Sequence, residues 1–192
     1  MAILALVANF AGKNFGKAKG SSVDGSANSV ATSAVDGPGA AAQGAAPRAP
    51  DISQMSPSQR AGLLYNRIMT YAENNQMDSA VFFTQMGIPA HLAIENPTND
   101  ERYHLARVAE VANDSTIARA EADTILQKEP KSLLGLLMGS RAALMNGNGP
   151  KAKKFDQQLL KVLDAELATI NEDYQVHRGE IDRAAADARR NK

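Results

Sequence analysis

The chain has 192 residues, enough for one domain with a tail, and its 21 Lys and Arg balance its 21 Asp and Glu. A general nucleic-acid-binding protein would carry a basic excess, so the balance argues against that class. The sequence contains no cysteine, which excludes disulfides, thiolate metal sites and cysteine nucleophiles.

Residues 1–19 begin with an apolar run and continue with lysines. On a helix the apolar side would carry Ile3, Leu6, Val7 and Phe10, and the basic side Lys13 and Lys17. An apolar stripe beside a basic face is typical of an interfacial membrane anchor, whereas the run is too short to span a bilayer and lacks the charged start of a secretory signal. The open alternatives are the remnant of a longer spanning helix and a helix docked on a partner protein. With a membrane present, the lysines favour the cytoplasmic side for the rest of the chain; a soluble or periplasmic location is the alternative.

Residues 20–55 form the expected linker. Of the 31 residues from Gly20 to Pro50, 22 are Gly, Ala, Ser or Pro, and none is apolar and larger than Val. Such a segment cannot bury enough surface to offset the entropy of ordering it, so the sequence predicts an extended arm. The glycine-rich stretch 36–44 does not fit a dinucleotide-binding fingerprint, because no strand precedes it and Pro38 interrupts it.

Residues 56–192 carry repeated helix signals. Because the whole chain has only four Tyr, five Phe and no Trp, its core must be aliphatic and alanine-rich, which suits helices. Ser56 with Gln59, and Thr98 with Glu101, form capping boxes. Further helix starts are expected at Asp78, at Asp114 or Ser115, at Ser132 and at Pro150. Helix ends are expected at Asn74, at Pro130 and at residues 146–149, and a break or kink is expected at Gly87 and Pro89.

Two later segments stand out by their apolar pattern. Residues 133–145 are apolar almost all round, which predicts a buried helix, and the row Gly135, Gly139, Ala143 would let neighbouring helices come close. Residues 150–190 keep a spacing of three to four between apolar residues. This final segment is therefore expected to be one long helix, or two helices broken near Asn171 or Gly179.

A period of 33 residues separates Pro97 from Pro130, each of which precedes a capped helix. A unit of two helices in 33 to 34 residues is the signature of a helical solenoid. Residues 56–164 resemble tetratricopeptide repeats. The positions that carry the resemblance are Leu105-Ala106, Ala118, Ala122 and Pro130, then Met138-Gly139, the turn Asn146-Gly147-Asn148, Ala152 and Phe155.

The resemblance departs from the family in its first unit, where Tyr71 and Ala80 fit but Gly87 and Pro89 do not. The aromatic residue that opens most repeats of the family is also missing. The expected fold is all-α: a short solenoid of helical hairpins, residues 56–192, with a long C-terminal capping helix and an extended N-terminal arm.

No set of residues predicts catalysis. The histidines, His91, His104 and His177, lack metal-binding spacing, and His104 is expected to pack with a hydrogen bond. Ser140 lacks the flanking pattern of a nucleophile elbow, and the neighbours Glu172 and Asp173 point apart on a helix. The glycosylation sequon at residues 113–115 falls in a tight turn between helices. We therefore expect no enzyme activity, no metal and no cofactor.

In tetratricopeptide repeats the first helix of each unit lines a concave groove that holds a peptide or another subunit. The resemblance implies that the partner-binding residues are Tyr65, Met69, Tyr103, Arg107, Glu110, Leu136 and Ser140. Tyr103 and Arg107, one turn apart, are the strongest candidates, because Tyr and Arg are enriched at interface centres. The alternative for Tyr65 and Leu136 is a place in the core.

These features predict a non-catalytic protein–protein interaction subunit. It would anchor or stabilise a larger membrane-associated bacterial complex, for example a respiratory or photosynthetic one, by contacts with other subunits and through residues 1–50 with a membrane surface or membrane protein. The alternative is a soluble adaptor or assembly chaperone that binds a partner peptide in the groove. Neither hypothesis involves nucleic acid.

Overall fold

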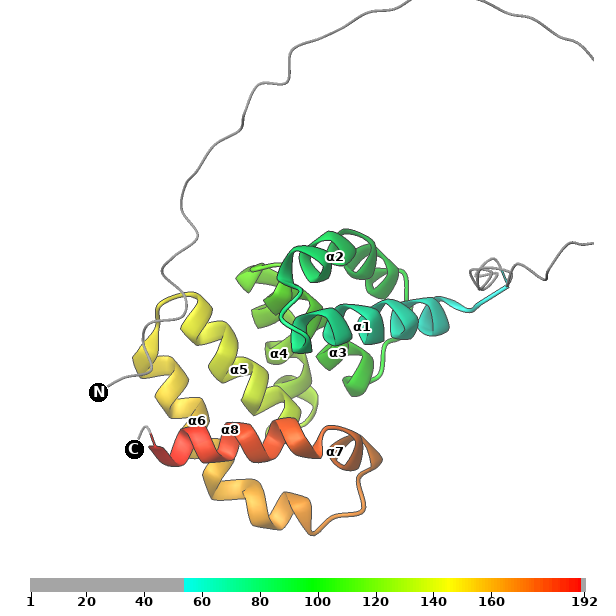
Figure 1. Ribbon diagram of the computed structural model, residues 1–192. Helices are drawn as coiled ribbons and strands as arrows, with labels where there is room; N and C mark the ends of the chain where they lie inside the picture. Colours follow the sequence, from blue (N-terminus) through cyan, green and yellow to red (C-terminus); the bar gives the residue numbers. More distant parts are fainter. Residues whose placement is uncertain (1–53, 191–192) are drawn as a thin grey trace, which may run out of the picture. The chain divides into compact units, whose positions relative to one another are not determined.

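The structure is a computed structural model that describes residues 54–190 (Figure 1). Within this range all regular secondary structure is helical, which confirms the all-α prediction. The helices are α1 (Pro57–Glu73), α2 (Met77–Leu92), α3 (Asn99–Val111), α4 (Ser115–Lys128), α5 (Leu133–Met145), α6 (Gly149–Leu167), α7 (Glu172–Val176) and α8 (Arg178–Arg190). None of them is both long enough and apolar enough to cross a membrane. The expected anchor, residues 1–19, and nearly all of the expected linker lie outside the described residues.

Local capping fixes most of the helix starts. The Ser56 hydroxyl accepts a hydrogen bond from the backbone N–H of Gln59, whose side chain accepts one from the Ser56 N–H. Thr98 and Glu101 form the same reciprocal pair at the start of α3. Each box satisfies amides that have no partner inside the helix. The predicted capping side chains at the starts of α4 and α5 are confirmed as well.

Helix α2 departs from the expectation at both ends. It begins at Met77, so Asp78 lies in its first turn and does not cap it, and it continues past Pro89 to Leu92. The structure gives Gly87 a packing role. A Cβ atom there would lie 2.7 Å from Cδ1 of Ile68, so the missing side chain lets α2 lie close against α1.

Consecutive helices pack as pairs, α1 with α2, α3 with α4 and α5 with α6, as in a helical-repeat fold (Figure 1). Helix α5 lies at the centre of the stack, in contact with α3, α4 and α6, and its residues 133–140 are all buried. Gly135 faces Ile125 and Leu126 of α4, and Gly139 faces the ring of Phe155 on α6. The predicted close approach along this row is therefore confirmed at both glycines.

The C-terminal segment forms three helices, whereas the sequence predicts one helix, or two with a break near Asn171 or Gly179; the structure has a break close to each of these positions. The first break lies at residues 168–171, and the Asn171 side chain caps α7. The reason for the break is tertiary, because Tyr174 on the short α7 is buried and its hydroxyl accepts a hydrogen bond from the backbone N–H of Leu133 at 3.2 Å. Helix α8 then packs back against α5 and α6, with Ile181 and Ala185 in the core (Figure 1).

Candidate functional site

The strongest predicted binding residues are covered by the chain's own C-terminal helix. The Tyr103 hydroxyl donates a hydrogen bond to Oε2 of Glu180 on α8 at 2.7 Å, and Tyr103 is fully buried. The Arg107 guanidinium contacts the other Glu180 oxygen at 3.0 Å and also pairs with Glu110. Arg141 of α5 reaches Glu110 at 3.1 Å. Helices α3, α5 and α8 thus meet in one ion-pair network, and Tyr103 has no surface left for a partner.

The other predicted residues divide between a groove and the core. Tyr65 and Met69, each less than a tenth exposed, line a groove of about 420 Å³ between α1 and residues 176–183, together with Glu180. Leu136 is fully buried in the core, as the alternative interpretation has it. Ser140 is also buried, and its hydroxyl donates a hydrogen bond to a carboxylate of α6 at 2.6 Å.

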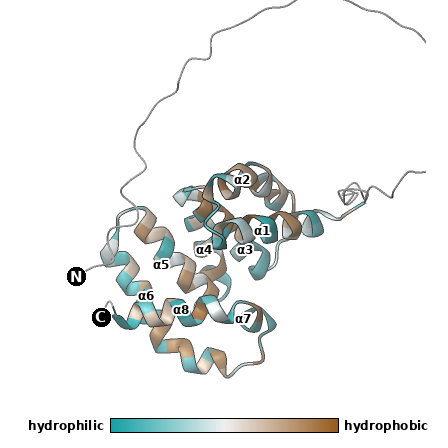
Figure 2. Cartoon of the chain, viewed as in Figure 1, coloured by the Kyte–Doolittle hydropathy of each residue, from teal (hydrophilic) through white to brown (hydrophobic). Residues whose placement is uncertain are grey.

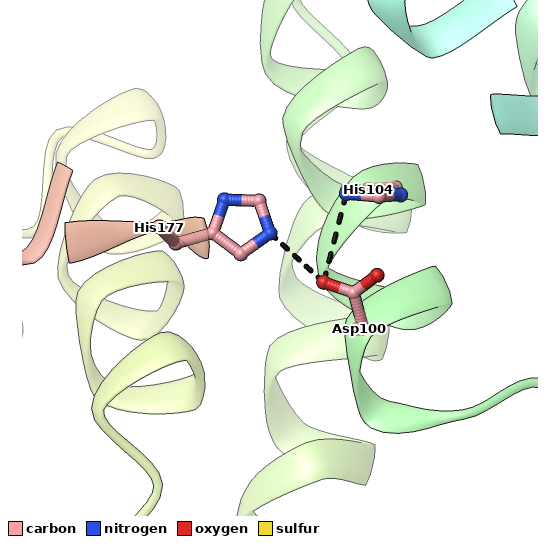
Figure 3. A group of neighbouring side chains, drawn as sticks. All are labelled: Asp100, His104 and His177. Atoms are coloured by element: carbon pink, nitrogen blue, oxygen red, sulfur yellow. Dashed lines mark hydrogen bonds and ion pairs between the residues drawn. The ribbon is translucent and has the colours of Figure 1, made fainter. Parts of the chain in front are cut away.

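Beside this network, Asp100, His104 and His177 form a group that we call the histidine cluster. Their ligand atoms all lie within 4.8 Å of one another. Both imidazoles are directed at the same carboxylate oxygen of Asp100, His177 Nε2 at 2.8 Å and His104 Nε2 at 3.6 Å (Figure 3). The other ring nitrogen of His177 lies 3.1 Å from Oε2 of Glu180. The His104 ring stacks on Tyr65 with 3.7 Å between ring centroids.

The two histidines of the cluster have opposite ionisation tendencies. Burial lowers the pKa of His104 to about 4, so its ring stays neutral near pH 7. Burial also disfavours the charged form of His177, but hydrogen bonds to Asp100 and Glu180 outweigh it and raise the pKa to about 9. For Glu180, burial is opposed by the His177 hydrogen bond and the Arg107 charge, which lower the pKa to about 2. In this site the negative charges of Asp100 and Glu180 therefore face the positive charges of His177 and Arg107.

The sequence pattern did not reveal the partners of these residues. Asp100 and His177 are 77 positions apart, and no spacing rule connects them. The sequence gives one hint of a buried polar site: two polar residues, His104 and Arg107, lie between apolar neighbours on the buried side of a helix. The prediction that His104 packs with a hydrogen bond is confirmed for the packing, by the stacking on Tyr65, whereas its contact with Asp100, at 3.6 Å, is longer than a hydrogen bond.

A second feature lies on α2, which has two apolar sides. The side against α1 and α3, the inner seam, consists of Ala80, Thr84, Gly87 and His91. The opposite side, the outer seam, consists of Phe82, Met86, Pro89 and the residue after the helix, Ala93. All four outer residues are exposed, Phe82 by 60% and Met86 by 44%. Exposed Val81 and Leu92 flank them, while the exposed polar residues Asp78 and Gln85 lie beside Phe82, so the outer side of α2 is mostly but not wholly apolar (Figure 2).

The described residues form an all-α stack of helical hairpins. Helix α8 covers the polar network, and the outer seam of α2 is an apolar surface that the described residues leave exposed. Comparison of the chain with protein-family models, with curated proteins and with solved structures finds no match.

Proposed function

We propose that the chain is a non-catalytic interaction subunit of the tetratricopeptide type, and that the outer seam of α2 binds an amphipathic helix of another protein. The observation that carries this proposal is the exposure of Phe82 and Met86 on a helix whose opposite side is already buried. A surface helix normally carries polar residues on the side away from the core, so exposed Phe82 and Met86 on that side of α2 are unusual. Contiguous apolar surface on a soluble domain marks an interaction site.

The spacing of the outer seam supports a helix as the occupant. Its residues follow one another at four, three and four positions, the same spacing as the inner seam that α1 and α3 cover. Side chains at this spacing form the ridge that packs into the groove of a neighbouring helix. In a stack of hairpins each unit packs against its neighbours. A partner helix at the outer seam would extend the stack by the same kind of helix–helix contact.

The groove is a weaker candidate surface. Glu180 of α8 bonds to Tyr103 and Arg107, so these two polar side chains are not free to bind a peptide. The part that stays open is lined by Tyr65 and Met69, and it favours the alternative function, capture of a partner peptide by a soluble adaptor. Met69→Glu should abolish binding under that alternative and leave the outer seam unaffected.

We further propose that the subunit belongs to a membrane-associated assembly, with residues 1–19 as the anchor and the helical domain on the cytoplasmic side. The support is the apolar stripe and the lysines of that segment. Deletion of residues 1–50 should release the chain from the membrane fraction, and unchanged retention would contradict the anchor.

The outer seam is tested by photo-crosslinking in the cells that make the protein. Benzoylphenylalanine replaces Phe82 in one chain and Leu144 in a second; the two side chains are equally exposed, each by 60%, and Leu144 lies on α5. We expect an adduct from position 82 and none from position 144. Mass spectrometry of the adduct should identify a partner peptide with apolar residues three and four positions apart.

A second substitution in the same chain supplies the specificity control. Met86→Glu places a charge in the seam, one turn from position 82, and should abolish the adduct. The proposal fails if positions 82 and 144 give the same adducts, if neither gives any, or if position 82 links only to a second copy of this chain.

A further inference from the structure

We propose that the histidine cluster is a binding site for one Zn²⁺ ion, with Asp100, His104 and His177 as its three protein ligands. The site would lie between α3 and the junction of α7 with α8 (Figure 3). This inference goes beyond the proposed interaction function and does not depend on it. It replaces the expectation from sequence that the chain holds no metal.

The donor atoms stand close to the separations that zinc requires. Bonds of 2.0 to 2.2 Å in a tetrahedral arrangement place neighbouring ligand atoms about 3.3 Å apart. The separation from Asp100 Oδ1 is 2.8 Å to His177 Nε2 and 3.6 Å to His104 Nε2, which brackets that value. The remaining separation, between the two histidines, is at most 4.8 Å. To reach that value, the separation from Asp100 must lengthen by about 0.5 Å at His177 and shorten by about 0.3 Å at His104.

The surroundings hold these ligands in place. Asp100 and His104 are four positions apart, so they project from the same face of α3, whose first turn is fixed by the capping box at Thr98. The His104 ring stacks on Tyr65. His177 sits between two helices, and its backbone oxygen accepts hydrogen bonds from the start of α8. None of the three ligands lies on a loose surface loop.

Glu180 supplies the outer contact that metal-binding histidines usually have. Its carboxylate lies 3.1 Å from Nδ1 of His177 and so holds a proton on that nitrogen. The opposite nitrogen, Nε2, bonds to Asp100 when no metal is bound, and it would release its proton to solvent when it binds the ion as a ligand. A carboxylate bound to a histidine in this way also orients the ring and increases its basicity.

The ligand types select the class of ion. Two imidazoles with one carboxylate suit Zn²⁺ and its neighbours among the transition metals, whereas Mg²⁺ and Ca²⁺ prefer oxygen ligands throughout. Three protein ligands leave the fourth position for water. His177 also lines the 420 Å³ groove, which gives the ion a route from solvent. A bound ion would join residues 77 positions apart and hold the C-terminal helices against α3.

The test uses the full-length chain without a histidine tag, stripped with a chelator and titrated with Zn²⁺ in a calorimeter. We expect one equivalent per chain and a rise in the thermal midpoint of several degrees, because the ion binds the folded state. Addition of Co²⁺ should give the visible absorption of a four-coordinate site. Mg²⁺ should not compete.

His104→Gln is the diagnostic variant, because His104 lies 3.6 Å from Asp100, whereas His177 is bonded to it at 2.8 Å. It should bind Zn²⁺ at least about 10-fold more weakly. The matched control is His91→Gln, a buried histidine that contacts the Gly87 carbonyl and lies outside the cluster; its affinity should be unchanged.

No stoichiometric uptake by the wild-type chain would overturn the proposal, as would equal affinity in the wild type and His104→Gln or loss of binding in His91→Gln. If His104→Gln does not fold, the wild-type Co²⁺ spectrum decides. A pale six-coordinate spectrum rejects the site, and four-coordinate bands that Zn²⁺ removes support it.

Discussion

At the scale of single residues, two glycines in helix interiors can be used to test the close packing of α5 against α4. A Cβ atom on Gly135 would lie 2.9 Å from Cγ2 of Ile125 and from Cδ2 of Leu126, both on α4, whereas one on Gly62 of α1 would meet nothing within 4 Å. We expect Gly135→Ala to lower the free energy of unfolding by about 1–3 kcal/mol through overpacking. Gly62→Ala should leave it unchanged or raise it by up to about 1 kcal/mol through helix propensity. Urea denaturation of both variants measures the difference, and equal effects would contradict the close approach.

The buried hydrogen bond from Tyr103 to Glu180 gives a second residue-scale prediction. Tyr103→Phe keeps the ring and removes only the donor, so we expect a loss of about 2 kcal/mol in the free energy of unfolding. In a double-mutant cycle with Glu180→Ala the two losses should sum to more than the loss in the double variant, because both variants remove the Tyr103–Glu180 contact. Additive losses would mean that α8 does not contact α3 through this pair.

At the scale of elements, the two seams of α2 should respond differently to substitution. Phe82→Glu changes an exposed side chain, and we expect the free energy of unfolding to stay within about 0.5 kcal/mol of the wild type. Ala80→Leu adds volume to a fully buried position and should cost about 1–3 kcal/mol. Chemical denaturation checks both. A large loss in Phe82→Glu would mean that the outer seam is part of the fold and is not free for a partner.

The individual helices also show which parts of this fold can be predicted from the sequence. Capping boxes, such as that at Thr98, and the apolar pattern of residues 133–145 are local, so helix positions and the buried α5 follow from the sequence. The break near Asn171 is one of the predicted alternatives, but the extension of α2 past Pro89 and the separate short helix α7 do not follow, because packing against other helices decides them. The long-range contacts of Glu180 have no local signal at all.

At the scale of the whole molecule, α8 determines which surfaces are available. Through Glu180 it covers Tyr103 and Arg107, the residues that the sequence singles out for partner binding, and it leaves Phe82 and Met86 of the outer seam exposed. The sequence singles out Tyr103 and Arg107. It could not reveal that their partner is the chain's own C-terminus, because that pairing exists only in the folded stack.

The most direct test of the proposed interaction compares native assemblies that contain three versions of the chain. Wild type, Met86→Glu and Leu144→Glu are each expressed in the cells that make the protein, and extracts are separated by size under native conditions. We expect the wild type and Leu144→Glu to run within a larger assembly, while Met86→Glu, whose charge lies in the outer seam, runs as the free chain. Assembly of the Met86→Glu chain at the wild-type level would contradict a docking role for the outer seam.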